Sequence, residues 1–178
     1  MASRACYGRT KLTSVTASSA TSIGDDAFNG CASLSFFNDK NNSVKSATVG
    51  ARAFADCRSL AQVTVAKAVT SIGEGVFQGC TGMTTLTLAD GSFSSSKKIP
   101  KSAFRGCTSL TLYRRSASTE TGTSYANYKF PKAITKIEDE AFYGCSSLTT
   151  VGLSENIEEI GQNIFGNIKL NALLFWCT

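Results

Sequence analysis

The chain has 178 residues, of which 17% are charged, and a formal net charge of +5 at pH 7. A chain of this size can form one domain with a sizeable core, and its charged fraction is too low for a disordered segment. Histidine is absent, which excludes Ser-His-Asp and Cys-His catalysis and every zinc site that needs a histidine ligand.

The beginning of the chain predicts a strand and no export signal. The first fifteen residues, MASRACYGRTKLTSV, contain no apolar run as long as that of a signal peptide. No window approaches the roughly 18 apolar residues that a transmembrane helix needs. In residues 12–17, LTSVTA, apolar side chains at 15 and 17 flank a threonine, and this period of two predicts a short strand. We expect this strand to belong to an incomplete first unit of the pattern that follows.

A nine-residue motif, IGDDAFNGC at residues 23–31, is the first of six similar segments. The others are VGARAFADC (49–57), IGEGVFQGC (72–80), IPKSAFRGC (99–107), IEDEAFYGC (137–145) and IGQNIFGNI (160–168). Their phenylalanines, at positions 28, 54, 77, 104, 142 and 165, are 26, 23, 27, 38 and 23 residues apart. The basic unit is therefore 23 residues long, and three units carry insertions of 3, 4 and 15 residues.

A strand-like segment follows the motif. It reads LAQVTV at residues 60–65, MTTLTL at 83–88 and LTTVGL at 148–153. A unit of 23 residues cannot bury its own apolar side, whereas stacked units build one continuous core. Since all units run in the same direction, we expect their strands to pair in parallel.

Two positions of the motif predict its backbone. The residue before the cysteine is Gly, Asp or Asn in all copies: Gly30, Asp56, Gly79, Gly106, Gly144 and Asn167. These residue types tolerate the left-handed region, so we expect a positive φ there that ends a one-turn helix in each unit. The position after the first Ile or Val holds Pro100 and Glu138 in two copies, so its glycines do not serve a left-handed turn.

The combined pattern, L-x-x-V-x-L followed by V-x-x-I-G-x-x-A-F-x-x-C, resembles the BspA-type (Treponema pallidum-type) leucine-rich repeat from about Leu12 to Cys177. The resemblance implies a β-rich α/β fold, a right-handed leucine-rich-repeat solenoid with a parallel concave sheet and one-turn helices. We expect one domain, residues 1–178, with about seven rungs, of which the outer two are incomplete, and an insertion at 113–131. Members of the family are typically surface or secreted proteins, and many are described as adhesins.

The cysteines of the motif occupy one equivalent position: Cys31, Cys57, Cys80, Cys107 and Cys145. Ile168 takes this position in the last copy, which indicates an apolar slot in the core. A metal-binding or disulfide ladder is the alternative, although the chain has no Cys-x-x-Cys pair. We expect no metal site and no cofactor.

The acidic pair of the first motif, Asp25 and Asp26, is predicted to be replaceable surface. The aligned positions in other copies hold Arg52 and Lys101, so the sign of the charge reverses between copies. Chemistry that needs a carboxylate in each unit would not survive this reversal. Acidic residues are mildly favourable at a helix start, which fits the one-turn helix expected here.

Two surfaces are candidates for binding. On the concave sheet, the residues between the apolar ones are small and neutral: Gln62, Thr64, Thr85, Thr87 and Thr150. Residues 97–136 contain nine basic side chains opposed only by Glu120, whereas residues 137–178 contain six acidic and one basic. The basic region and the Ser/Thr-rich insertion predict a docking loop for an acidic protein: Lys97, Lys98, Arg114, Arg115, Tyr125, Tyr128, Lys129 and Lys132. A solvated loop without a partner is the alternative.

The last strand-like segment, NALLFWCT, suggests a contact with another subunit. If the spacing of the other units holds, Leu174 and Trp176 face the core, and Leu173 and Phe175 face outward. No polar capping segment follows, so this edge predicts self-association or a larger assembly, unless the chain is a fragment.

The repeats account for nearly every residue and leave no catalytic group over. The sequence therefore predicts a non-catalytic protein–protein interaction module or scaffold subunit, with no nucleic acid as partner. A cell-surface adhesin is the alternative, and an enzyme is the least favoured one. The missing export signal favours an intracellular location or a larger complex, whereas the resemblance implies the cell surface.

Overall fold

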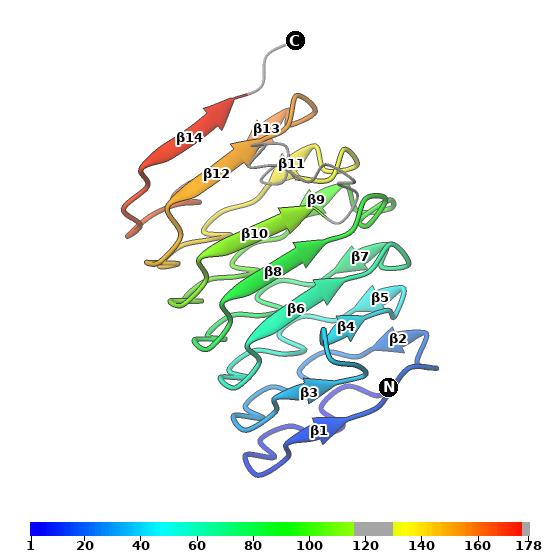
Figure 1. The fold of residues 1–178 in the computed structure, drawn as a ribbon. Coiled ribbons are helices and arrows are strands. Elements are labelled where there is room, and N and C mark those ends of the chain that lie inside the picture. The colour runs from blue at the N-terminus through cyan, green and yellow to red at the C-terminus, as the bar shows by residue number, and fades with distance from the viewer. Residues whose placement is uncertain (116–129, 176–178) are drawn as a thin grey trace.

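The computed structural model describes residues 1–115 and 130–175, with side chains at 1–111 and 130–174. These residues form a parallel β-solenoid of about six turns (Figure 1). The sequence predicted about seven rungs, two of them incomplete. No described residue is helical, so the predicted α/β content and its one-turn helices are wrong, although the solenoid of parallel strands is confirmed.

Eight strands of two or four residues form what we call the main face, which contains all the four-residue strands. They are β1 (Ser14–Val15), β3 (Phe36–Phe37), β4 (Ser43–Val44), β6 (Gln62–Val65), β8 (Thr85–Leu88), β10 (Leu112–Arg115), β12 (Thr150–Leu153) and β14 (Ala172–Phe175). Their ladders are parallel, in the orders β1-β3, β4-β6-β8-β10 and β12-β14. Alternation places Val63 and Val65 of β6 inside, next to Leu86 and Leu88 of β8.

Short strands form the second face. They are β2 (Ser22–Ile23), β5 (Thr48–Val49), β7 (Ser71–Ile72), β9 (Lys98–Ile99), β11 (Lys136–Ile137) and β13 (Glu159–Ile160). They pair in parallel in the orders β2-β5-β7 and β9-β11-β13. Each begins one copy of the motif. The Ile or Val of the first five copies enters the core, as Ile23, Val49 and Ile99 do, whereas Ile160 of the last copy is exposed.

The motif phenylalanines stack through the core. Adjacent rings of Phe28, Phe54, Phe77, Phe104 and Phe142 have centroids 5.1 to 5.8 Å apart and interplanar angles of 8 to 20°. Phe165 extends the stack in a tilted orientation, 6.0 Å from Phe142. The five cysteines of the motif are fully buried, which confirms that they occupy a core slot. A ladder of phenylalanines therefore joins the turns that carry the six copies of the motif.

The corner of each turn, which contains AFNGC and its equivalents, is not a helix because its amides alternate between two kinds of partner. In the first copy, Ala27 N–H bonds the Gly24 carbonyl within the turn, whereas Phe28 N–H bonds the Ala53 carbonyl of the next turn at 2.8 Å. Such amides cannot also form the bonds of an α-helix. The corner thus continues the stacking of the strands.

Two left-handed residues shape each corner. The predicted positive φ before the cysteine is confirmed in all six copies, with 75° at Gly30 and 55° at Asp56 as examples. A second left-handed residue lies four positions earlier and was missed, because five of its six occupants are not glycine. Asp26 (φ 53°) and Arg52 (φ 51°) are two of them. A positive φ at the third residue of a hydrogen-bonded four-residue turn is typical of type II turns.

We expect Gly106→Ala to lower the free energy of unfolding by about 1 kcal/mol. Gly106 has a φ of 72°, and an added Cβ would meet no atom closer than 3.9 Å, so backbone strain is the main cost. Chemical denaturation of the two proteins measures this cost. Gly106→Asn is the matched control and should cost less, because Asn167 already occupies the equivalent position. An alanine variant as stable as the original protein would contradict the inferred strain.

The glycines that follow the first Ile or Val have no positive φ, as predicted. They lie where the backbone of one corner comes close to the backbone of the next. A Cβ at Gly24 would lie 2.5 Å from the backbone nitrogen of Ser3, and one at Gly161 would lie 2.5 Å from that of Asp139. Adjacent corners touch here through their backbones.

Residues 1–9 form a further corner that the sequence did not reveal. Cys6 N–H bonds the Ala27 carbonyl at 2.7 Å, and Gly8 N–H bonds the Asn29 carbonyl at 2.8 Å, as in the other corners. Cys6 takes the position of the phenylalanine, and Arg9 takes that of the cysteine, which hides the motif. This first corner is basic and polar, as terminal turns of repeat proteins often are.

Candidate functional site

The acidic pair of the first motif has a structural role. Asp25 Oδ1 accepts a hydrogen bond from Ala51 N–H at 2.8 Å, and Asp26 Oδ1 accepts one from Arg52 Nε at 2.9 Å. The hydrogen bond from Arg52 holds the pKa of Asp26 below its ordinary value. Both carboxylates therefore join one turn to the next.

The cysteine ladder has the properties of a packing element. Each thiol donates a hydrogen bond to a carbonyl of the preceding turn, as Cys80 does to Phe54 at 3.1 Å and Cys107 to Phe77 at 3.2 Å. Burial raises the pKa of the Cys80 thiol to about 12. The ladder cysteines are free thiols, and the described residues contain no group of three His, Cys, Asp or Glu side chains able to hold a metal.

Each of the three insertions coincides with a break in a ladder. The shortest separates β3 from β4 within one turn. The second precedes β9, which does not pair with β7. Pro100 contributes here, since it lacks the N–H that Gly50 and Gly73 donate to the preceding turn at 2.8 and 2.7 Å. The third lies between β10 and β12, which do not pair either.

The break between β10 and β12 is confined to the main face. The corners of the same two turns remain joined, as Phe104 N–H bonds the Ala141 carbonyl at 2.9 Å, and β9 pairs with β11. Figure 1 shows β12 set further from β10 than β10 is from β8. The two turns therefore separate on the side from which the longest insertion departs.

The insertion begins later than its predicted start at residue 113. Strand β10 includes Tyr113, Arg114 and Arg115, whose backbone pairs with β8. Arg114 pairs with Thr87, and Arg115 has the register of the buried Leu88. These arginines belong to the sheet, while Tyr125, Tyr128 and Lys129 lie outside the described residues.

Part of the basic region is neutralised by the acidic region that follows it. Lys98 Nζ lies 2.8 Å from Glu138 Oε1, and Lys136 Nζ lies 2.8 Å from Glu159 Oε1. Arg105 pairs with Glu140 in the same way, at 2.7 Å. Lys98 is therefore an internal partner. Lys97 and Lys132, the other two predicted lysines that the structure describes, are exposed and have no ion pair with a described residue.

Glu138, in a cleft near Lys136, is poorly suited to act as a general acid. A polar cleft of about 370 Å³ is lined by Glu74, Lys101, Lys136, Glu138, Asp139, Glu159 and Gly161. Burial alone would raise the pKa of Glu138, but the hydrogen bonds from Lys98 and the Lys101 amide outweigh it, and the net shift is downward. A carboxyl group with a lowered pKa is a poor proton donor near neutral pH.

The predicted concave residues lie on the main face. Gln62 is exposed, and Thr64, Thr85, Thr87 and Thr150 are half-buried. Gln62 Nε2 donates to the Lys40 carbonyl at 2.7 Å, so its amide already has a partner. Phe36 of β3 was missed as an outward residue, although 39% of its surface is exposed.

The predicted facing of the last strand is wrong. Leu173 pairs with Val151, and Phe175 pairs with Leu153, so both have the register of core residues. The link from Ile168 to β14 is one residue shorter than in the preceding unit, and a shift of one residue moves every side chain to the other face. Leu173 is 38% exposed at the open end of the core, as is Ile160 at 46%.

Comparison with known proteins gives a family and a fold. A family model described as a BspA type leucine rich repeat region, in six copies, matches residues 1–126 and 117–176. No curated protein matches the chain. The crystal structure of a leucine-rich repeat protein of T. pallidum is similar, with 26% identity and a TM-score of 0.72, over 94% of this chain and 68% of that one.

A second solved structure supports the same fold. A leucine-rich repeat protein of Bacteroides ovatus is 21% identical, with a TM-score of 0.54, over 90% of this chain and 48% of that one. Among the described residues there is no helix long and apolar enough to cross a membrane.

Proposed function

The chain belongs to the BspA-type leucine-rich repeat family, and we propose that it is a non-catalytic protein-binding module whose partner contacts lie where the repeat is interrupted. Leucine-rich repeat proteins generally mediate binding, are typically non-catalytic, and in some cases lie at the cell surface. Adhesion at a cell surface is a narrower form of the same proposal.

The coincidence of insertions with broken ladders carries the proposal. In the regular turns, backbone amides, thiols and carboxylates are used to join neighbouring turns, as for Ala51, Cys80 and Asp26. An insertion that interrupts a ladder removes hydrogen bonds between neighbouring strands and does not stabilise the scaffold. In repeat proteins such insertions commonly project from one face and carry binding.

We expect replacement of residues 116–129 by a short Gly/Ser linker to remove the specific partner in affinity capture from the natural source, reducing its recovery by about tenfold or more. Quantitative mass spectrometry of the captured proteins measures the effect. Thermal unfolding of both proteins shows whether the scaffold remains intact.

The matched control replaces a joined corner instead of the insertion. A variant carrying Asp26→Asn and Arg52→Gln loses an ion pair between turns but keeps the insertion. It should capture the same partner as the original protein. Equal recovery by the insertion variant, or loss of the partner only in the corner variant, would contradict the proposed location of binding.

A further inference from the structure

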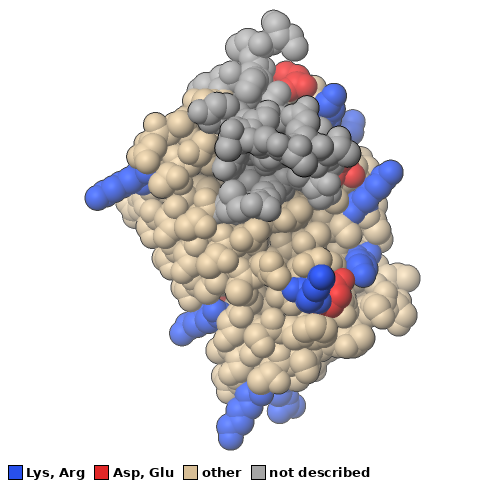
Figure 2. Space-filling view, in the orientation of Figure 1, with Lys and Arg blue, Asp and Glu red and all other residues tan. Residues whose placement is uncertain are grey.

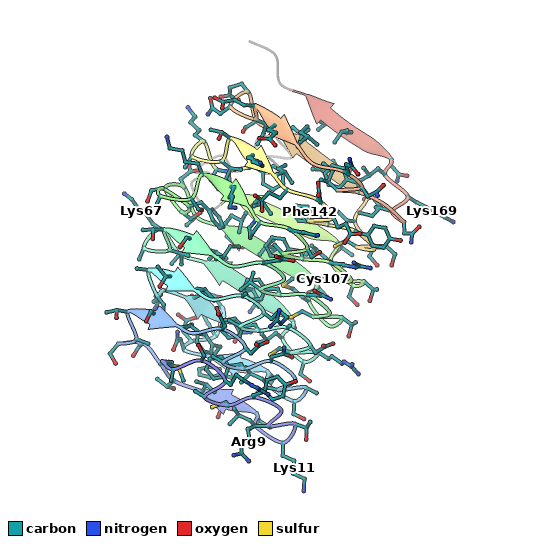
Figure 3. The ribbon with its side chains drawn as sticks, turned by 180° about the vertical axis from the view of Figure 1, so that it is seen from behind. Arg9, Lys11, Lys67, Cys107, Phe142 and Lys169 are labelled. Atoms are coloured by element: carbon teal, nitrogen blue, oxygen red, sulfur yellow. The ribbon has the colours of Figure 1, made fainter. Side chains whose placement is uncertain are left out.

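Three lysines lie at the connecting edge, by which we mean the segments that lead from the main face to the second face. Lys67 follows β6, Lys97 precedes β9, and Lys132 precedes β11. All three are exposed, and none forms an ion pair with a described residue. Figure 3 shows Lys67 at the margin of the solenoid, pointing away from the ribbon.

The three lysines belong to consecutive turns. Phe93 N–H bonds the Val69 carbonyl at 2.8 Å, which joins the connection of Lys67 to that of Lys97. Thr135 N–H bonds the Lys97 carbonyl itself at 2.8 Å, which joins the next one. Because neighbouring strands are about 4.8 Å apart, the outer two lysines are separated by roughly 10 Å along the solenoid.

At the opposite edge of the solenoid, which the corners of the turns form, some basic side chains have acidic partners. There, Arg52 pairs with Asp26, and Arg105 with Glu140. At the connecting edge itself, Lys45 pairs with Asp39 at 3.1 Å, one turn before Lys67. Within the described part of the chain, the three lysines are therefore a local group of cations without an ion pair. Figure 2 shows isolated basic side chains along the margins of an otherwise largely neutral face.

The three lysines are donors only. An ammonium group donates hydrogen bonds, accepts none and carries a positive charge, so these side chains are suited to carboxylates.

We propose that the connecting edge binds an extended acidic segment of a protein partner, laid along the solenoid axis across Lys67, Lys97 and Lys132. This inference rests on the proposed function. Alternate side chains of an extended chain repeat every 6.6 to 7 Å or so, so carboxylates at the first, third and fifth of five residues span about 13 to 14 Å. That span is long enough to reach both outer lysines, which lie roughly 10 Å apart along the solenoid. The insertion joins the body at the same edge, between Arg115 and Phe130, so both would serve one partner.

A protein segment fits this edge better than a nucleic acid does. Binding of single-stranded nucleic acid relies on several phosphate contacts together with aromatic side chains for base stacking. Among its described residues, the connecting edge has three cations without an ion pair, and its aromatic residues Phe93 and Phe130 are buried.

The test uses the full chain and a fluorescent peptide of alternating Glu and Ser residues with four glutamates. Fluorescence anisotropy at about 50 mM and about 300 mM salt measures its affinity, and we expect binding that weakens at the higher salt. The same peptide with Gln in place of Glu should not bind. A variant carrying Lys67→Glu, Lys97→Glu and Lys132→Glu should bind the acidic peptide about tenfold more weakly or worse.

The control variant carries Arg9→Glu, Lys11→Glu and Lys101→Glu, which are exposed and without ion pairs among the described residues. It changes the net charge by the same amount and should weaken binding by less than about threefold. Equal weakening in both variants would overturn the proposal, because net charge alone would explain it. Tighter binding of a single-stranded oligonucleotide through the same lysines would overturn it as well.

The outcome for the proposed function is separate. If the natural partner depends on residues 116–129 but binds the lysine variant unchanged, the acidic-segment proposal fails and the binding module stands. If no partner depends on the insertion, the proposed location of binding at residues 116–129 is contradicted, whether or not the acidic peptide binds.

Discussion

Replacement of Phe77 by alanine is expected to lower the free energy of unfolding by about 3–5 kcal/mol. Phe77 is fully buried between Phe54 and Phe104, with ring centroids 5.4 and 5.8 Å away and nearly parallel planes. Removing the ring leaves a cavity in the middle of a one-dimensional core. Because each turn contacts only its neighbours, the two halves of the array can then unfold separately.

Chemical denaturation followed by two probes tests this expectation. Fluorescence and far-UV circular dichroism should give coincident transitions in the original protein and separate ones in the variant if the array divides. Phe36→Ala is the matched control, since 39% of Phe36 is exposed on the main face, and it should cost less than about 1 kcal/mol. A Phe77 variant within 1 kcal/mol or so of the original protein would contradict the stacked core.

The five ladder thiols are expected to react with a thiol reagent at least about a thousandfold more slowly in the native protein than in denaturant. They are fully buried, and burial raises the pKa of the Cys57 and Cys80 thiols, so the reactive thiolate is scarce. Cys6 is only half-buried and is therefore more accessible to the reagent, so it should react first among the described cysteines. A Cys6→Ser variant identifies this fast phase.

The raised pKa values also give a pH dependence. A buried thiol stays neutral in the folded chain while the unfolded thiol ionises near its ordinary pKa of 9.0. The contribution of this difference to the free energy of unfolding is complete below pH 9. It is lost as the pH rises toward the pKa of the thiol in the folded chain, which is about 12 for Cys80.

Rapid labelling of five or more thiols in the native protein near neutral pH would contradict the buried ladder.

The regular part of the fold could be predicted because its signal is repeated six times. A phenylalanine or a cysteine at one equivalent position points to the core when five copies agree, and Ile168 shows which property the position needs. The helix prediction failed because a left-handed residue before the cysteine fits both a helix end and a turn. The second left-handed position separates the two, but Asp26 and Arg52 gave no sign of it.

The ends of the solenoid were harder because a single residue changes the register. The shortened link after Ile168 exchanges the faces of Leu173 and Leu174, and no periodicity argument detects such a deletion. At the other end, Cys6 and Arg9 replace the two residues that define the motif. Terminal turns differ from internal ones because one of their sides has no neighbour.

The candidate site could be located by its broken periodicity but not by its contacts. The insertion was visible as a change in spacing. The pair of Lys98 and Glu138 was not, because 40 residues separate them, and the same holds for Lys136 and Glu159 across one turn. Which lysines lack an ion pair depends on this pairing, so the sequence revealed neither the lack of a pair at Lys67 nor the internal partner of Lys98.

We propose that the regular turns serve the scaffold and that the interrupted turns carry binding. Isothermal titration of the captured partner into three proteins tests it most directly: the original chain, the chain with residues 116–129 replaced, and the corner variant with Asp26→Asn and Arg52→Gln. We predict that affinity falls by about tenfold or more in the second protein and changes by less than about twofold in the third. Unchanged affinity in the second protein together with a loss in the third would contradict the claim.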